Sequence, residues 1–160
     1  MKLERMELVG LEVSDLDAAI AEFSELLDTE FIRIEFDGSV KIEELPADEP
    51  PHAMATRMSM AMDKSGYLEL LQSHPPTSRE RVRNIHFKVD DIEAAIVTMK
   101  AKGYRLVQNI RIGTMREAVW GAREAHGLRM CMVQYDAPSM IEAMLDVPVD
   151  QSVLPEGRGA

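Results

Sequence analysis

The sequence predicts an α+β protein built from two tandem βαβββ modules, and three observations lead to this prediction. The first is size: 160 residues, 46% of them hydrophobic, suffice for one ordinary domain or for two half-size units that share a core. The second is an internal repeat, in which residues 9–20 (VGLEVSDLDAAI) match residues 85–96 (IHFKVDDIEAAI) at five of twelve positions. The third is a further match in the same order, between residues 67–72 (YLELLQ) and 129–134 (RMCMVQ). Two ordered matches indicate a duplicated unit of about 60–75 residues, which is too long for a solenoid repeat.

Each copy of the repeat begins with a strand that leads into a helix. Apolar residues alternate over residues 9–13, which is the period of a strand with two different faces. Ser14 then opens a capping pattern, and apolar residues follow at helical spacing over residues 16–27. The second copy repeats the alternation over residues 85–89, with a cap formed by Asp90 and Glu93 and a helical apolar stripe from residue 92 to residue 99. The two copies therefore predict the same strand–helix unit.

Three short strands complete each predicted module. Their ranges, set by alternation and turn residues, are 31–36, 55–62 and 67–72 in the first copy and 105–112, 117–124 and 128–134 in the second. The acidic, proline-bearing residues 37–51 read as a surface loop, and residues 139–145 as a short helix. The predicted organisation is a first module over residues 5–73, a second over residues 80–136, and a C-terminal helix and tail over residues 137–160.

Charge and cysteine content narrow the classes of partner and compartment. The formal net charge of −10 argues against nucleic acid or an anionic membrane as the main partner. The single cysteine, Cys131, has no internal disulfide partner and favours a reducing compartment. No signal-peptide pattern opens the chain, and no apolar run is long enough to span a bilayer. We therefore expect a soluble, cytoplasmic protein.

The duplicated unit resembles the vicinal-oxygen-chelate superfamily, which contains glyoxalase I, methylmalonyl-CoA epimerase, extradiol dioxygenases and bleomycin-resistance proteins. The resemblance covers roughly residues 5–136 and lies in the motifs GLEVSDLDAA, HFKVDDIEAA, ELLQ and HGLRMCMVQ. It implies two modules whose curved mixed sheets form a half-barrel cleft, usually with a metal at its base. In that pattern the ligands come from the first strand of each module, usually as His or Gln, and from its last strand, usually as Glu.

The family's metal-ligand positions fall here on Leu8, Glu69, Asn84 and Cys131, and only Glu69 keeps the expected residue type. A leucine cannot coordinate a metal, and a set of Cys, Glu and Asn mixes soft and hard donors. We therefore predict no metal at the usual position and no cofactor. A divalent metal held in an unorthodox way, through Glu69, His86 and either Glu12 or Cys131, is the remaining metal alternative.

Strand alternation places polar groups on the cleft-facing side of the first strands. If Leu8 faces inward then so does Glu12, and in the second copy the same rule selects Asn84, His86 and Lys88. These residues can also have a purely structural role. Glu12 and Lys88 can form a salt bridge, and a single histidine in a strand is often hydrogen-bonded to the neighbouring backbone. Glu69 carries the strongest signal, because a buried carboxylate between two leucines needs a partner or a raised pKa.

These residues support two functions of different classes. The first is a metal-free isomerase, epimerase or lyase that moves a proton next to a carbonyl or thioester, with Glu69 and His86 as catalytic residues. Glu12, Asn84, Lys88, Trp120 and Cys131 are the predicted substrate-binding residues. The second is a binding protein of the bleomycin-resistance type, in which Trp120 offers the stacking surface with Tyr67 and Tyr135 behind it.

The sequence also predicts the oligomeric state of the chain. The segment SMIEAMLDVPV (residues 139–149) carries apolar residues beyond the second module, and open sheets leave strand edges bare. We expect a homodimer that buries this segment, the alternative being that it folds back onto its own chain. The sequence leaves open whether the two modules pair within one chain or across a dimer.

Overall fold

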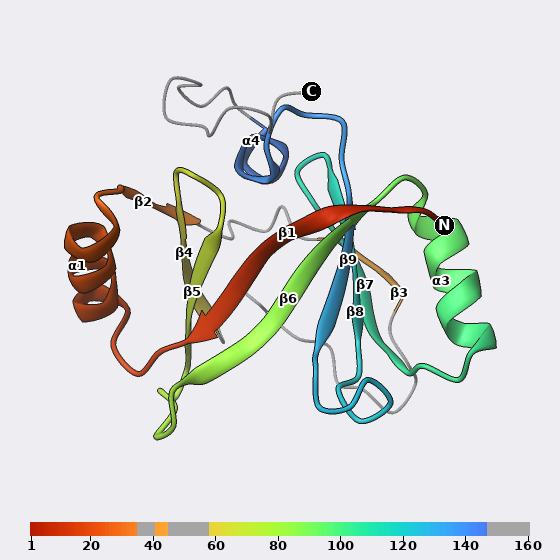
Figure 1. The fold of residues 1–160 in the computed structure, drawn as a ribbon, viewed down its shortest axis with the longest axis horizontal. Helices are drawn as coiled ribbons and strands as arrows, with labels where there is room; N and C mark the ends of the chain where they lie inside the picture. Colours follow the sequence, from red (N-terminus) through yellow and green to blue (C-terminus); the bar gives the residue numbers. More distant parts are fainter. Residues whose placement is uncertain (35–40, 45–57, 147–160) are drawn as a thin grey trace.

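The computed structural model describes residues 1–34, 41–44 and 58–146 and contains one strongly curved, mixed nine-stranded sheet (Figure 1). The strands run along the sheet in the order β2-β4-β5-β1-β6-β9-β8-β7-β3. The elements in chain order are β1 (Leu3–Glu12), α1 (Leu16–Leu27), β2 (Phe31–Ile34), β3 (Lys41–Glu44), β4 (Met58–Asp63), β5 (Leu68–Ser73), β6 (Arg81–Val89), α3 (Ile92–Ala101), β7 (Leu106–Ile112), β8 (Met115–Trp120), β9 (Met130–Gln134) and α4 (Met140–Leu145).

The two modules lie side by side in one chain and repeat the same pairing pattern. In the first, β1 pairs in parallel with β5, and β5 and β4 continue antiparallel towards β2. In the second, β6 pairs in parallel with β9, and β9, β8 and β7 follow antiparallel. The modules meet where β1 and β6 pair antiparallel, with Leu8 opposite His86 and Gly10 opposite Asn84. The α+β class and the duplicated unit agree with this architecture, and the question of how the modules pair is answered within one chain.

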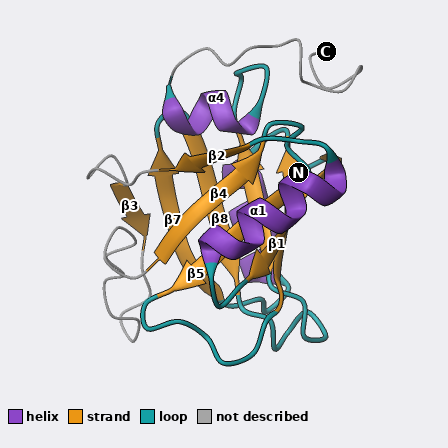
Figure 2. Ribbon diagram, turned by 90° about the vertical axis from the view of Figure 1, so that its left-hand side faces the viewer, coloured by secondary structure: helices purple, strands orange, loops and turns teal. Residues whose placement is uncertain are grey.

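Helices α1 and α3 cover the convex face of the sheet, one on each module (Figure 1, Figure 2). Each begins at an aspartate whose side chain accepts a hydrogen bond from the backbone two residues into the helix, at Asp15 and at Asp91. The caps therefore stand one residue later than Ser14 and Asp90, where the sequence pattern had predicted them. Both helices bury an apolar stripe against the strands of their own module.

The predicted loop over residues 37–51 contains a strand in its described part. Residues Lys41–Glu44 form β3, which pairs antiparallel with β7 at the far edge of the second module. Its Glu43 accepts charge-assisted hydrogen bonds from Arg111 on β7 and Arg116 on β8. Three charged residues and one isoleucine gave no strand signal by themselves, so the open edge of β7 provides the pairing that makes this segment a strand.

Other strand boundaries moved by a few residues. The predicted strand over residues 117–124 is β8, which begins at Met115 and ends at Trp120, before a loop that starts at Gly121. The strand predicted over residues 55–62 starts at Met58 within the described residues. Residues 35–36 and 55–57, which the predicted strands also included, lie outside the described part of the chain.

The predicted C-terminal helix is present as α4, and it folds back onto its own chain. Ser139 caps its first turn, and Met140, Ile141 and Met144 are buried in an apolar cluster with strands of both modules. In Figure 1, α4 lies between the two halves at one end of the concave face. This burial covers the described part of the apolar segment from which the homodimer was predicted, and residues 147–149 of that segment lie outside the described residues. The homodimer stays a prediction that light scattering can test. Among the described residues, no helix has the length and apolar content to cross a membrane.

Candidate active site

The half of the concave face that α4 does not fill holds a small polar cavity of about 60 Å³. It lies between the last strands of the two modules and the start of β6. Its described lining comprises Met58, Met60, Glu69, Leu71, Arg83, Asn84, His86, Gln108, Glu117, Val119, Arg129 and Cys131. Of the seven residues that the sequence singled out, the structure brings four into this cavity: Glu69, Asn84, His86 and Cys131.

Glu69 is buried on β5 with 2% of its surface exposed, and its Oε2 has no hydrogen-bond partner among the described residues. Asn84 on β6 has a similarly unpartnered Oδ1. A Cβ on Gly10 would stand 1.8 Å from that Oδ1 and 2.7 Å from Glu69 Oε2, so both side chains fill the space that this glycine leaves. A proton on Glu69 would let the two neighbouring oxygens share a hydrogen bond. This agrees with the raised pKa of Glu69, which burial causes against the opposing charge of His86.

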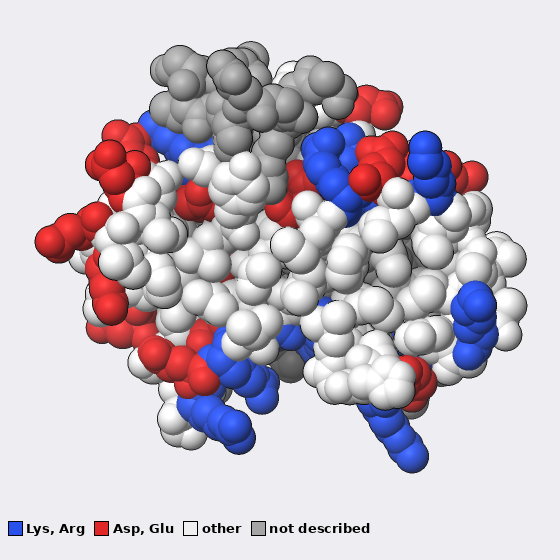
Figure 3. Space-filling model, viewed as in Figure 1, with Lys and Arg blue, Asp and Glu red and all other residues white. Residues whose placement is uncertain are grey.

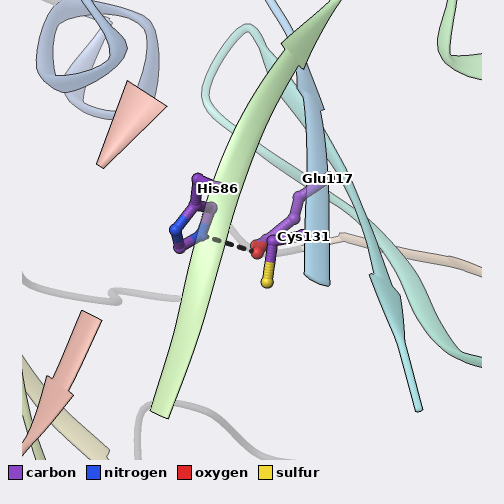
Figure 4. Close-up of side chains that lie close together, drawn as sticks. All are labelled: His86, Glu117 and Cys131. Carbon is purple, nitrogen blue, oxygen red and sulfur yellow. Dashed lines mark hydrogen bonds and ion pairs between the residues drawn. The ribbon is translucent and has the colours of Figure 1, made fainter. Parts of the chain in front are cut away.

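His86 and Glu117 form a buried pair beside Glu69, with 3.0 Å between His86 Nε2 and Glu117 Oε1 (Figure 4). Burial alone would lower the pKa of His86, but Cys131, Glu69 and the hydrogen bond to Glu117 together raise it well above its ordinary 6.5. Burial would likewise raise the pKa of Glu117, but the interaction with His86 lowers it. The pair therefore favours an imidazolium next to a carboxylate. His86 Nδ1 has no partner among the described residues.

Cys131 is fully buried on β9, opposite His86 on β6. Its Sγ accepts a long hydrogen bond of 3.7 Å from Asn84 Nδ2. Burial raises the pKa of its thiol to about 11, although His86 opposes the shift. At neutral pH this group is a thiol, which is neither a nucleophile nor a base.

Glu12 and Lys88 do not line this cavity. Glu12 is 5% exposed and accepts hydrogen bonds from Arg81, Arg83 and Ser73, which lower its pKa against the effect of burial. Lys88 lies towards α4, with its Nζ 4.2 Å from the ring centroid of Tyr135 and 3.7 Å from Glu4. The alternation rule had put both on the cleft side, but register irregularities along β1–β6 and the length of the two strands carry them away from Glu69.

Trp120 does not line the cavity, so the prediction that it binds substrate is wrong. It is completely buried on β8, in the apolar cluster that α3 covers on the opposite face of the second module. Its neighbours Glu117 and Val119 face the cavity instead. Because side chains alternate along a strand, a tryptophan one position from Val119 faces the helix, and it offers no stacking surface to a ligand.

Three ionisable residues of the cavity lining were not among the predicted site residues: Arg83, Glu117 and Arg129. A signal was present for two of them. Glu117 is an ionisable residue in a strand whose other inward position is Val119, and Arg129 stands two residues before Cys131, hence on the same face. Arg83 gave no such signal, because it alternates with Asn84 and reaches the cavity from the strand end.

The sequence matches a known protein family over most of its length. Residues 9–119 match the family described as Glyoxalase/Bleomycin resistance protein/Dioxygenase superfamily. This chain belongs to that superfamily. No curated protein matches the sequence closely enough to serve as a relative.

Solved structures of the superfamily share the fold at low sequence identity. A variant of Streptomyces coelicolor methylmalonyl-CoA epimerase, in complex with 2-nitronate-propionyl-CoA, is 20% identical with a TM-score of 0.61, over 85% of this chain and 97% of that one. Methylmalonyl-CoA epimerase from Mycobacterium tuberculosis is 16% identical with a TM-score of 0.64, over 84% and 90% of the two chains. The hypothetical protein BH1468 from Bacillus halodurans is 16% identical with a TM-score of 0.62, over 83% and 95%. At these identities the likeness shows the fold alone.

The residues present do not fit a metal at the superfamily's usual four positions. Leu8 is 1% exposed and packs in the apolar cluster with α4, and Asn84 offers only an amide oxygen. A different set of donors does converge: ligand atoms of His86, Glu117 and Cys131 lie within 4.8 Å of one another. Nitrogen, carboxylate and thiolate together suit zinc better than a hard cation.

Proposed function

We propose that this chain is a proton-transfer enzyme, an isomerase, epimerase or lyase that acts on the carbon next to a carbonyl or thioester, without a metal at the superfamily's usual position. The observation that carries the proposal is Glu69: a fully buried carboxyl group, with an unpartnered oxygen in the cavity and a raised pKa. Burial that raises the pKa of a carboxyl group makes its carboxylate a stronger base than one in water.

The proposed step begins when Glu69 takes the α-proton of the substrate, and the electrons of the broken C–H bond form an enolate. His86, kept protonated beside Glu117, donates a hydrogen bond from Nδ1 to the enolate oxygen. The proton then returns to the same or a neighbouring carbon, or the enolate expels a leaving group from the β-carbon. Asn84 supplies a second polar contact at the same place.

One base suits this site better than two. The strand position that corresponds to Glu69 in the second module holds Cys131, and a thiol with a pKa of about 11 is a poor partner for inversion at neutral pH. Where the reaction is an elimination, His86 is the second proton carrier, which protonates the leaving group.

Deuterium exchange tests the proposal without knowledge of the product. Short acyl thioesters, β-keto acids and hydroxyketones are incubated with the protein in D2O, and loss of the α-proton signal is followed by NMR. We expect exchange in at least one class, and Glu69→Gln should slow it by about 10²–10⁴-fold. Glu7→Gln is the matched control, because Glu7 is also buried but pairs with Arg5 and Tyr135 outside the cavity. Undiminished exchange in the Glu69 variant would exclude Glu69 as the base.

The convergence of His86, Glu117 and Cys131 favours a second candidate, a metal-dependent enzyme with ligands displaced from the usual positions. Elemental analysis separates the two. Protein that is active with much less than one metal per chain supports the metal-free scheme. Exchange that vanishes with a chelator and returns with zinc supports the second candidate. The alternative function, a binding protein of the bleomycin-resistance type, needed Trp120 as a stacking surface for the ligand. Trp120 lies under α3 and is not available for this.

A further inference from the structure

A wider groove of about 670 Å³ adjoins the buried cavity. The groove and the cavity share part of their lining, including Arg83 and Arg129, so these two arginines stand between the two spaces. The groove is also lined by Arg105 and Arg123, with Glu124 as its acidic residue among the described lining. Figure 3 shows basic side chains along the lower edge of one face, beside acidic ones, in a surface that is mostly uncharged.

Three guanidinium groups meet here around one carboxylate. Glu12 accepts from Arg81 and Arg83 at 2.9 Å each, and one carboxylate charge cannot neutralise both. Arg129, half-buried between them and Cys131, has no hydrogen bond or ion pair from its side chain to a described residue. Burial and the charges of Arg83 and Arg81 lower the pKa of Arg129, which means that they destabilise its charged form.

This surplus is unusual in a chain with a net charge of −10. An arginine held near two other arginines that share a single carboxylate costs free energy unless a further anion completes the site. The planar guanidinium group also matches carboxylate and phosphate oxygens in a bidentate way.

We propose that Arg129 and Arg83 bind the anionic group of the substrate and hold its acidic carbon against Glu69. This proposal rests on the proposed function in one respect, that Glu69 is the base. The anion site itself is argued from the arginines alone. The cavity beyond them, at about 60 Å³, admits only a few non-hydrogen atoms. The substrate class is therefore a carbon acid whose reactive carbon is a few bonds from a carboxylate or phosphate, with the remainder of the molecule in the groove.

Calorimetric titration with simple anions tests the site separately from catalysis. Malonate represents the carboxylate source, methylphosphonate the phosphate source, and malonamide the uncharged control. We expect one of the two anions to bind and malonamide not to bind. Arg129→Gln should weaken binding of the anion at least tenfold, and Arg129→Lys should weaken binding less. Arg79→Gln, an exposed arginine outside the groove, should leave the affinity unchanged.

Tighter binding of malonate assigns the site to a carboxylate, and tighter binding of methylphosphonate assigns it to a phosphate. Absence of binding by both anions, or equal affinity in the Arg129→Gln and Arg79→Gln variants, overturns the proposal. Glu69→Gln should still bind the anion, so binding that survives together with full exchange activity in that variant refutes the catalytic role of Glu69 and leaves the anion site standing.

Discussion

The two modules share one pairing pattern and carry very different side chains at equivalent positions. Where the first module has Leu8 and Gly10 on β1, the second has Asn84 and His86 on β6, directly across the strand pair. Where β5 carries Glu69, β9 carries Cys131. The duplication thus provides the scaffold, and the asymmetry provides the site, because the absence of a side chain at Gly10 makes room for Glu69 and Asn84. The predictions below test how far the two halves depend on each other.

Helix α4 contacts both halves, so a cavity in its core should weaken the whole sheet. Ile141 is 1% exposed in the cluster that joins Leu8 and Met60 of the first module to Val133 of the second. Ile141→Ala should lower the free energy of unfolding by about 2–5 kcal/mol, measured by urea denaturation. Val97→Ala, at a site 68% exposed on α3, should change it by less than about 0.5 kcal/mol. A variant in which only one module unfolds would show that α4 does not couple them.

A side chain at Gly10 should make the first module more like the second and damage the site. In Gly10→Ala the new Cβ would overlap Asn84 Oδ1 and crowd Glu69, so both must move. We expect a loss of about 1–3 kcal/mol in the free energy of unfolding and a marked fall in deuterium exchange. Gly121→Ala is a control for stability, since its Cβ would lie 3.0 Å from the side chain of exposed Glu124, which can move, and at ordinary contact distance from Arg105. Wild-type exchange in Gly10→Ala would mean that the crowding of Glu69 and Asn84 has no part in activity.

Two buried carboxylates of the first module should respond to pH with opposite signs. The pKa of Glu69 is raised above 4.5, so its stabilising contribution is complete below pH 4.5 and is lost as the pH rises through its folded-state pKa. Glu69→Gln should therefore gain stability over the wild type as the pH rises, by about 1.4 kcal/mol for each pKa unit of the shift. The pKa of Glu12 is lowered, so its contribution is present above pH 4.5 and is lost as the pH falls through its folded-state pKa.

Glu12→Gln should accordingly be less stable than the wild type at pH 7, and the two should converge in acid. Unfolding curves at several pH values, with circular dichroism as the signal, give both differences. If Glu69→Gln were destabilising at pH 7, the carboxylate of Glu69 would have a favourable partner in the folded protein, contrary to its unpartnered oxygen.

The duplicated strand–helix unit, the short C-terminal helix and the burial of Glu69 could be predicted from the sequence, because periodicity and self-similarity are local properties of the chain. Strand alternation also put Asn84 and His86 on one face, and the resemblance to the superfamily put Glu69 and Cys131 at the same cleft. Which of the predicted residues come into contact depends on the three-dimensional fold. Strand irregularity and length carry Glu12 and Lys88 away from Glu69, and the face that α3 covers takes Trp120 into the core. The pairing of His86 with Glu117, and of Arg83 with Glu12 near Arg129, joins residues 31 or more positions apart. Such contacts follow from the order and curvature of the strands, which no local pattern encodes.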